Sequence, residues 1–446
     1  MKKNVENARL TAIEIIEDVF YRGAYSNLAL KKKLNSSTLS VRDRALVTEI
    51  VYGTLRYKYT IDRILDKFLK NDIEKQNSFI KNVLRTSLYQ IIYLDKIPEF
   101  AVVNEAVELS KKRYSRLSKL VNGVLRNFLR KRKSIELEER EDVEKLCFKY
   151  SFAPWMVNLF KSQYGIETAE AILKGLDCIP KVTVRVNRLK TNFTSCWNEL
   201  VQNGYNLRKP ELCSDAIVID RGSDIEKNIL FSKGMISVQD ESAMLPVMAM
   251  DLEKNMTVID VCSAPGGKTC YMAEVMENTG KVFAFDIYEN KIKIIAKNAE
   301  RLGIKNIEAG IFDACNCNLN MKERADRVLA DVPCSGIGII RKKPEIKWNK
   351  SMKQLENLIG VQRKIMQNSA EYVKPSGVFV YSTCTLNKNE NEKNVEWFLK
   401  NNSEFTLEKL DFGRKDNIIY HRNGCVTVLP DENMDGFFVA KMIKHR

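Results

Sequence analysis

Two cysteines are the residues of this chain best suited to chemistry, because each follows an apolar run typical of a buried strand. Cys334 closes the run Asp-Val-Pro-Cys after the largely apolar residues 327–330, and Cys384 closes Ser-Thr-Cys after residues 377–381. In an open α/β sheet, ligands and reacting groups gather at the carboxyl ends of the strands. A thiolate at such a place can attack a substrate and form a covalent intermediate. The pattern therefore predicts group transfer through a cysteine adduct.

Substitution at C5 of a pyrimidine is a reaction that would use such a thiol. Cytosine C5 is a poor nucleophile and becomes enamine-like only after a thiolate adds at C6. The addition needs a cysteine of lowered pKa and a hydrogen-bond partner near N3. Asp331 lies in the loop of Cys334 and could be that partner, as a carboxyl whose protonation is tuned by burial. Buried cysteines are also common core residues, and we interpret Cys147, Cys178, Cys196, Cys213 and Cys425 in that way.

A glycine-rich loop upstream predicts a nucleoside-type cofactor site. Gly266 and Gly267 follow an apolar strand and open a helix, so the backbone can approach a ligand closely and offer free N–H groups. The loop lacks the Gly-x-x-x-x-Gly-Lys-Ser/Thr spacing of triphosphate-binding loops. Asp286 ends the next strand, where a carboxylate can bind ribose hydroxyls, and Asp313 ends the third strand, where it could accept a hydrogen bond from an adenine amino group. S-adenosylmethionine fits this pattern, although a helix cap for Asp286 and a turn for Asp313 are the simpler alternatives.

Composition sets bounds on the partners and the compartment. With 446 residues and a formal net charge of +15, from 72 Lys+Arg against 57 Asp+Glu, the chain favours several domains and a polyanionic partner such as nucleic acid. Its 11 cysteines form no Cys-x-x-Cys pair and its only histidines are His421 and His445, which argues against zinc and against a Ser-His-Asp triad. We expect reduced thiols, a cytoplasmic location, no metal, no membrane partner and a monomer.

The alternation of elements predicts three domains. Residues 1–135 carry apolar side chains at helical spacing and predict an all-α domain. Residues 136–245 begin with a run of acids and predict a linker and a small α+β RNA-binding subdomain, with strands at 182–186 and 216–219 and a helix at 193–203. Residues 246–446 alternate strands with helices, which predicts a Rossmann-like parallel sheet with helices on both faces. Its expected strands are 258–261, 281–285, 306–312, 327–330 and 377–381, its helices 268–276, 289–302 and 352–373, with a turn at 375–377 and a terminal hairpin at 426–430 and 436–440.

A basic run in residues 110–135 predicts contact with RNA. It holds lysines and arginines without an acid, interleaved with apolar residues at helical spacing, so a helix could dock while its basic face meets phosphates. A merely solvated face is the alternative. The candidate residues are Lys111, Lys112, Arg113, Arg116, Lys119, Arg126 and Arg130.

Taken together, these motifs resemble those of the RsmB/Sun (Fmu) family of 16S ribosomal RNA cytosine-C5 methyltransferases. The glycine loop at 260–269, the Pro-Cys and Thr-Cys loops, and the runs 238–244 and 341–348 carry the resemblance. Residues 51–56 and 120–126 are similar to NusB-like RNA-binding helical domains. The resemblance covers nearly the whole chain and implies a class I S-adenosylmethionine-dependent methyltransferase domain preceded by a NusB-like domain.

The resemblance also implies a role for individual residues. Cys384 would be the nucleophile, Cys334 would promote loss of the C5 proton and release of product, and Asp331 would contact the base at N3. The substrate would be 16S rRNA, either naked or in an early small-subunit particle. Alanine is usual at the position of Ser263, and a small polar residue should be tolerated there. The cofactor would be held by Cys262, Ser263, Ala264, Pro265, Gly266, Gly267, Lys268, Asp286, Asp313 and Asp331.

Other functions stay open at this point. The same chemistry could act on transfer RNA, or the chain could be an RNA-binding ribosome-assembly factor with a vestigial transferase domain. The complete set of acidic and thiol residues speaks against the assembly factor. A methyltransferase acting on amino groups is disfavoured, because the Asp-Val-Pro-Cys run has no aromatic residue after proline to stack a base.

Overall fold

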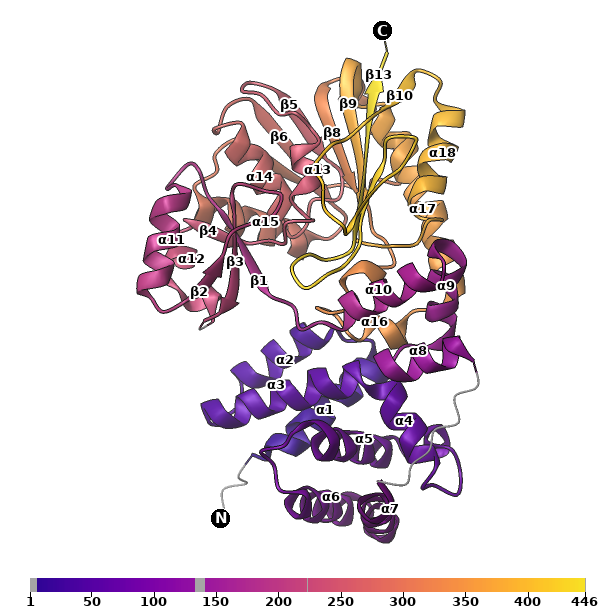
Figure 1. The fold of residues 1–446 in the computed structure, drawn as a ribbon. Helices are drawn as coiled ribbons and strands as arrows, with labels where there is room; N and C mark the ends of the chain where they lie inside the picture. Colours follow the sequence, from indigo (N-terminus) through magenta and orange to yellow (C-terminus); the bar gives the residue numbers. More distant parts are fainter. Residues whose placement is uncertain (1–5, 133–140, 223, 446) are drawn as a thin grey trace. The chain divides into compact units, whose positions relative to one another are not determined.

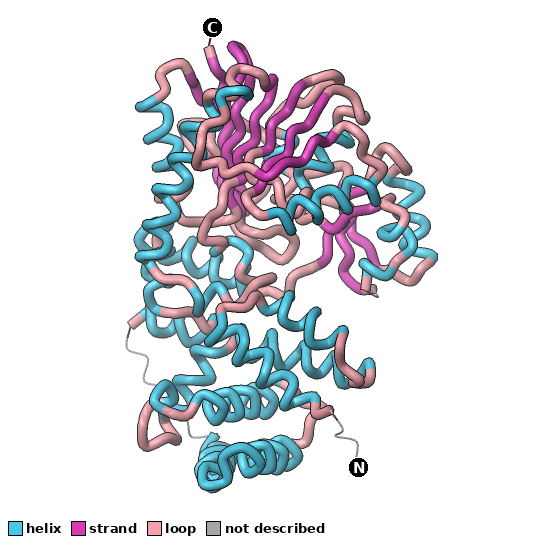
Figure 2. Tube along the Cα trace, turned by 180° about the vertical axis from the view of Figure 1, so that it is seen from behind, coloured by secondary structure: helices cyan, strands magenta, loops and turns pink. Residues whose placement is uncertain are grey.

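The computed structural model describes residues 6–132, 141–222 and 224–445. The chain divides into two compact units, which we call the helical unit (Met1–Asp177 with Ile340–Lys350) and the sheet unit (Cys178–Ile339 with Ser351–Arg446). Figure 1 labels their elements, and Figure 2 shows strands only in the sheet unit among the described residues. The predicted boundaries at 135/136 and 245/246 stay predictions, and the first, with the start of the acidic linker, lies outside the described residues.

The helical unit confirms the all-α prediction for the N-terminal part of the chain. Helix α1 begins where the Asn7 side chain accepts a hydrogen bond from the Leu10 N–H, and it ends at Gly23, whose φ of 68° suits a residue without a side chain. One apolar core joins α1, α2 and α3, and a second joins α4 to α7. The α-helices are α1 (Ala8–Arg22), α2 (Ser26–Asn35), α3 (Val41–Arg56), α4 (Lys58–Asp66), α5 (Ser78–Tyr93), α6 (Glu99–Tyr114), α7 (Ser118–Lys131), α8 (Asp142–Tyr150), α9 (Pro154–Tyr164), α10 (Ile166–Asp177) and α16 (Ile346–Asn349).

The sequence pattern suggested a single helix through the basic run, but the structure divides it. Helix α6 ends at Tyr114, a 3-10 turn occupies Ser115–Leu117, and α7 then begins at Ser118. The apolar face of α7 is buried through Val121, Val124, Leu125 and Phe128, as its spacing predicted. All seven basic candidates are exposed, so their charges are available to a polyanion.

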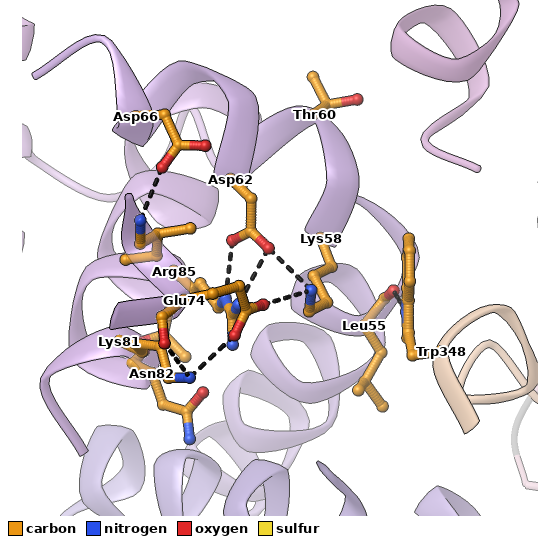
Figure 3. Close-up of polar contacts among 12 residues, drawn as sticks. Leu55, Lys58, Thr60, Asp62, Asp66, Glu74, Lys81, Asn82, Arg85 and Trp348 are labelled. Carbon is orange, nitrogen blue, oxygen red and sulfur yellow. Dashed lines mark hydrogen bonds and ion pairs between the residues drawn. The ribbon is translucent and has the colours of Figure 1, made fainter. Parts of the chain in front are cut away.

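A buried ion network joins α4 and α5 inside the helical unit. Arg85 is only 1% exposed, and its guanidinium binds both carboxylate oxygens of Asp62, with Nε to Oδ1 at 2.7 Å and Nη2 to Oδ2 at 2.9 Å. Nη2 also binds Glu74 at 2.7 Å, and Lys58 bridges the same two acids (Figure 3). Burial alone would raise the pKa of Glu74, but Lys81, Arg85 and Lys58 together lower it to about 2.

A segment from the second half of the sequence belongs to the helical unit. Residues 340–350 leave the sheet unit after Ile339 and rejoin it at Ser351. Glu345 accepts hydrogen bonds from both the backbone N–H and the hydroxyl of Ser26 at the start of α2. Lys347 donates to three backbone carbonyls at 3.1 Å each. The indole N–H of Trp348 donates to the Leu55 carbonyl at 2.6 Å, and both residues are labelled in Figure 3. The family-like run 341–348 is thus an anchor within the helical unit.

The sheet unit begins with a small α+β part, as predicted. Its four-stranded antiparallel sheet has the order β2-β3-β1-β4, and α11 packs on it over a core that includes Cys196 and Leu200. The predicted strand at 182–186 and helix at 193–203 are confirmed. The elements are β1 (Val182–Val186), α11 (Phe193–Gln202), β2 (Asn206–Arg208), β3 (Ala216–Arg221), α12 (Ile229–Ser232), β4 (Ile236–Val238) and α13 (Leu245–Met248).

The larger part of the sheet unit confirms the Rossmann-like prediction. Its nine-stranded sheet has the order β11-β12-β13-β9-β8-β5-β6-β7, with β10 paired to β13. Strands β5 to β9 pair in parallel, and β13 joins β9 in antiparallel sense. Strands β12 and β13 pair with each other in antiparallel sense, so the predicted terminal hairpin is also present. The elements are β5 (Thr257–Asp260), α14 (Gly267–Val275), β6 (Lys281–Asp286), α15 (Glu289–Leu302), β7 (Ile307–Ile311), β8 (Ala325–Asp331), α17 (Met352–Ala370), β9 (Val373–Thr383), α18 (Glu392–Asn401), β10 (Phe405–Glu408), β11 (Ile418–Tyr420), β12 (Val426–Val428) and β13 (Phe437–Lys444).

Successive strand residues bury their side chains on opposite faces of this sheet. Val258 packs in a core that includes side chains of α14 and α15, whereas Ile259 packs in a second core with side chains of α17 and α18. Helices therefore cover both faces, as predicted. The expected turn at 375–377 is wrong, because β9 runs through these residues. The strand is irregular there: its pairing with β8 shifts register between Ala325 and Arg327, and Ser376 has a positive φ of 63°.

We expect Asp62→Asn to destabilise the protein strongly, because the buried Arg85 would lose half of a charged, two-point contact. Breaking one partner of a buried ion pair costs about 3–5 kcal/mol of unfolding free energy. Urea denaturation followed by circular dichroism measures the change. The matched control is Asp18→Asn, whose pair with Arg22 is exposed and contributes about 1 kcal/mol or less. Equal losses in the two variants would contradict the expectation that the buried pair contributes more to stability than the exposed one.

Candidate active site

The candidate site lies where the strand order of the large sheet reverses. Strand β5 pairs with β6 on one side and with β8 on the other, so the connections diverge between β5 and β8. Ligands bind at such a switch point, beyond the carboxyl ends of the strands. The glycine loop follows β5, Cys334 follows β8 and Cys384 follows β9, whose last pair with β8 is Asp331 opposite Ser382. The topology therefore brings the three predicted loops together.

The two sulfur atoms lie next to each other. Sγ of Cys334 is 3.3 Å from Sγ of Cys384, and both side chains are half-buried. The adjacent Cys384 sulfur, burial, and the carboxylates of Glu390 and Asp331 raise the pKa of the Cys334 thiol. Cys334 therefore keeps its proton more readily than an ordinary cysteine, and it can offer that proton to the second sulfur.

A lysine and an aspartate lie beside the sulfurs. Nζ of Lys268, in the first turn of α14, is 2.7 Å from Oδ2 of Asp331, and the Ser382 hydroxyl donates to Oδ1 at 2.8 Å. Burial disfavours the charge of Lys268, but the carboxylate of Asp331 outweighs it and raises the pKa of this lysine. The ammonium group also interacts electrostatically with Cys384. A fixed positive charge near a thiol favours its thiolate.

The glycine loop is tied to the neighbouring strand by the residue that departs from the family pattern. The Ser263 hydroxyl lies 3.0 Å from the Asp260 carbonyl and 2.8 Å from the Phe285 carbonyl, and the Ser263 N–H donates to Phe285 as well. Serine is thus tolerated because its hydroxyl finds acceptors. Gly266 has a φ of 97°, and an added Cβ would lie 3.3 Å from Cα of Ile295. The positive φ and the close approach of α15 both favour glycine here.

Two carboxylates follow the glycine loop along the sheet. Asp286 is buried at the end of β6, where it accepts from the Tyr288 N–H and pairs with Lys291 at 3.3 Å. Asp313 is exposed beyond β7 and accepts from the Cys315 N–H at 2.9 Å. Asp286 does not cap α15, whose N-cap is Tyr288 without a side-chain hydrogen bond. Both acids instead accept from the N–H two residues further on, as in a turn, and each carboxylate has further acceptor capacity. Acidic acceptors beside a helix N-terminus suit a nucleoside with a positively charged sulfonium.

The remaining predicted residues fall into two groups. Cys147, Cys196, Cys213 and Cys425 are buried, as expected of core residues, whereas Cys178 is only half-buried. The basic candidates belong to the helical unit and not to the unit that holds the sulfurs. Within the described ranges, no group of three or more His, Cys, Asp or Glu residues is arranged to hold a metal ion, and no helix is long and apolar enough to cross a membrane.

Sequence reasoning missed three polar residues of this region. Ser382 binds Asp331, and Glu390 and Thr385 form a buried network behind the sulfurs. The only hint in the sequence is the cluster of asparagines and acids after the Thr-Cys loop, which looks like an ordinary exposed turn. The structure shows that Glu390 is fully buried.

A second buried carboxylate lies under the glycine loop. Asp260, at the end of β5, is 1% exposed, and its Oδ2 accepts from the Thr269 hydroxyl at 2.7 Å. Burial raises the pKa of Asp260 from 3.8 to about 7, with a further contribution from the nearby charge of Asp331. The folded protein therefore holds a proton on Asp260 that the unfolded chain releases at lower pH.

We expect Asp260→Asn to change how stability depends on pH. Because the folded pKa is the higher one, the wild-type protein loses stability from this group as the pH rises from 3.8 to about 7, by up to about 1.4 kcal/mol per pH unit. Asparagine does not titrate. The unfolding free energy of the variant, relative to that of the wild type, should therefore rise between about pH 5 and pH 8. Urea denaturation at both pH values measures this gain, with Asp18→Asn as an exposed control. A difference that does not change with pH would show that Asp260 is ionised throughout.

Comparisons with known proteins agree with this architecture. Residues 247–443 match the family described as 16S rRNA methyltransferase RsmB/F, residues 6–130 match the NusB family, and residues 152–226 match an RsmF/B-like ferredoxin-like domain. Among solved structures, that of PH0851 has a TM-score of 0.83 at 25% identity and covers 99% of this chain and 100% of its own. A methyltransferase homolog from Pyrococcus horikoshii has a TM-score of 0.61 at 27% identity, covering 69% and 100%.

Curated relatives match the chain from end to end. A probable ribosomal RNA small subunit methyltransferase B of Bacillus subtilis (strain 168) is 37% identical over 451 residues, covering 100% of both chains. Its counterpart in Synechocystis sp. is 31% identical over 449 residues, covering 98% of this chain and 99% of the relative. The chain therefore belongs to the 16S rRNA methyltransferase RsmB/F family and is an S-adenosylmethionine-dependent rRNA methyltransferase.

Proposed function

We propose that this protein methylates C5 of a cytidine in 16S rRNA through a covalent bond between Cys384 and C6 of the base. One observation carries the proposal: the sulfur of Cys384 lies 3.3 Å from a second thiol, beside a lysine–aspartate pair at the switch point of the sheet. A single nucleophilic cysteine would suffice for many reactions. Two adjacent thiols suit a reaction that must both form and release a carbon–sulfur adduct.

Cys384 is the nucleophile in this proposal. Its thiolate forms a bond to C6, and the electron pair of the C5–C6 double bond becomes available at C5. The positive charge of Lys268 favours the thiolate of Cys384. None of the residues named at the site is a histidine. S-adenosylmethionine, when bound, supplies a methyl group that C5 can accept.

Asp331 assists at the opposite edge of the pyrimidine. Addition at C6 places negative charge on the ring, and a proton held at N3 stabilises it. Oδ2 of Asp331 accepts a hydrogen bond from the Lys268 ammonium group at 2.7 Å. The ammonium group can therefore pass a proton to this carboxylate, which can present the proton to N3. Ser382 fixes the other carboxylate oxygen and with it the orientation of the group.

Cys334 completes the reaction by removing the C5 proton. After methylation, C5 carries both a proton and a methyl group, and loss of the proton restores the double bond as the bond from C6 to Cys384 breaks. The electron pair of that bond returns to the Cys384 sulfur. Cys334 takes the C5 proton as a thiolate, so its own proton must first pass to solvent, because the neighbouring sulfur 3.3 Å away is bonded to C6 until the double bond re-forms.

Binding of cofactor and RNA is assigned to separate parts of the chain. We propose that the loop of Ser263 and Gly266, with Asp286 and Asp313, holds the adenosine, and that Lys268 and Asp331 border it on the side of the sulfurs. The exposed basic residues of α6 and α7 supply phosphate contacts in the NusB-like part. We also keep the division at 135/136 and 245/246 as part of this proposal.

Replacement of each thiol separates their two roles. We expect Cys384→Ala to abolish methyl transfer, because no adduct can form. Cys334→Ala should still form the adduct and accumulate a protein–RNA complex that survives denaturing gel electrophoresis, because proton removal at C5 is lost. The assay uses total small-subunit RNA and labelled S-adenosylmethionine.

Cys317→Ala is the matched control, since this thiol is exposed and outside the site. It should retain wild-type turnover without a trapped complex. An active Cys384 variant, together with a dead Cys334 variant that traps no RNA, would reverse the roles of the two cysteines.

Modification mapping decides which RNA is the substrate. We expect one 5-methylcytosine of 16S rRNA to disappear when the gene is deleted and to return with the wild-type gene but not with the Cys384→Ala form. Bisulfite sequencing of ribosomal and transfer RNA from the same cells measures both classes at once. Loss confined to transfer RNA would favour the alternative substrate, and no loss in either class would favour the assembly factor.

A further inference from the structure

A fully buried carboxylate lies behind the two cysteine loops. Glu390 follows the Thr-Cys loop in sequence, precedes α18, and is 0% exposed. It does not reach the open side of the site, where the sulfurs and Asp331 lie half-exposed. Nothing in the chemistry proposed above uses it directly, yet an ionisable side chain is seldom buried without a specific partner.

Glu390 holds the loop that carries Cys334. Its Oε2 accepts from the Ser335 N–H at 2.9 Å, and its Oε1 accepts from the Ser335 hydroxyl at 2.6 Å. Ser335 is the residue directly after Cys334. The Gln362 amide strengthens this contact from α17, because it donates both to Oε2 of Glu390 at 2.9 Å and to the Pro333 carbonyl at 3.1 Å. The residues on both sides of Cys334 are therefore fixed.

The same carboxylate is linked to the loop that carries Cys384. The hydroxyls of Ser335 and Thr385 lie 2.7 Å apart, and Thr385 directly follows Cys384. The Asn387 amide donates to Oε1 of Glu390 at 3.1 Å. The backbone of Glu390 is fixed as well, since its carbonyl accepts from the Tyr381 hydroxyl at 2.6 Å.

The strands alone cannot set the distance between the sulfurs. The last paired residues of β8 and β9 are Asp331 and Ser382. Each lies at least two residues before the cysteine of its own loop. Beyond that point the two loops are joined by the Val332 N–H to the Ser382 carbonyl, by the Gly338 N–H to the Cys384 carbonyl, and by the Glu390 network. Four donors converge on the two carboxylate oxygens of Glu390, two on each oxygen.

We propose that Glu390 is a positioning residue that holds the Cys334 and Cys384 loops together, so that the two sulfurs stay within reach of one base. The proposal rests on the two-cysteine reaction proposed above, and it concerns geometry that can be measured without that reaction. Glutamine at this position keeps the shape but presents two N–H groups to donors. The loops should then separate, and the sulfurs should meet less often.

The spacing of the sulfurs can be measured with a chemical cross-link. Diamide, an azo oxidant, accepts two electrons and two protons from a pair of thiols, which become a disulfide while the azo group becomes a hydrazine. Two sulfurs 3.3 Å apart need only a small approach to reach the disulfide length of about 2.05 Å. We expect the wild-type protein to form the Cys334–Cys384 cross-link rapidly and Glu390→Gln to form it about tenfold more slowly. Peptide mass mapping of the full chain identifies and times the product.

Activity provides the second measurement. Glu390→Gln should lower kcat for RNA methylation by about tenfold, while KM for RNA and the Kd for S-adenosylmethionine stay within about twofold of wild type. A general loss of structure would change all of these constants together. Ser335→Ala removes one donor to Glu390 and the link to Thr385, so it should also slow formation of the cross-link. This variant replaces Glu390→Gln in the test if the glutamine variant folds poorly.

Glu241→Gln is the matched control, because Glu241 is an equally buried carboxylate of the same unit that accepts from three backbone N–H groups far along the chain from the sulfurs. It should cross-link at the wild-type rate. Wild-type cross-linking in Glu390→Gln, or no cross-link in the wild type, would overturn the positioning role. If RNA assays instead failed to show C5 methylation while the cross-link still depended on Glu390, the proposed reaction would fall and the positioning role would stand.

Discussion

The parallel pairing of β8 with β9 is the constraint on which the site depends. It places the loops of Cys334 and Cys384 side by side, although 50 residues separate them in the sequence. The reversal of strand order beside β8 then brings in the glycine loop after β5, so that loop and the two thiols share one edge of the sheet. Without that order, the same residue types would be ordinary core cysteines and an ordinary tight turn.

Charge is distributed in two layers around the sulfurs. The half-exposed layer is the ion pair of Lys268 and Asp331. The buried layer is Glu390, whose four donors satisfy it and whose charge helps to keep the Cys334 proton in place. The two thiols therefore lie in different environments, although their sulfurs are only 3.3 Å apart.

Sequence patterns predicted the fold well where burial imposes a period. Helix α15 has the predicted bounds, with Gly303 at its end, and β1 also has the predicted bounds. The break between α6 and α7 was not predictable, because the basic and apolar residues keep the same spacing across it. The segment 340–350 and Glu390 were also missed for a physical reason: polar residues buried by distant partners, such as Ser26 for Glu345, have no local pattern. Motifs therefore indicated the candidate reacting groups, and only the structure showed the buried polar contacts around them.

The central claim is that the sulfur of Cys384 bonds to the base. Its most direct test is small-subunit RNA transcribed with 5-fluorocytidine, in which fluorine at C5 cannot leave as a proton does, so the adduct remains. After incubation with the protein and S-adenosylmethionine, peptide mass mapping locates the cross-linked nucleotide. The account predicts a nucleotide attached to Cys384 and none attached to Cys334. A nucleotide on Cys334, or a methylated RNA with no attachment to either thiol, would contradict it.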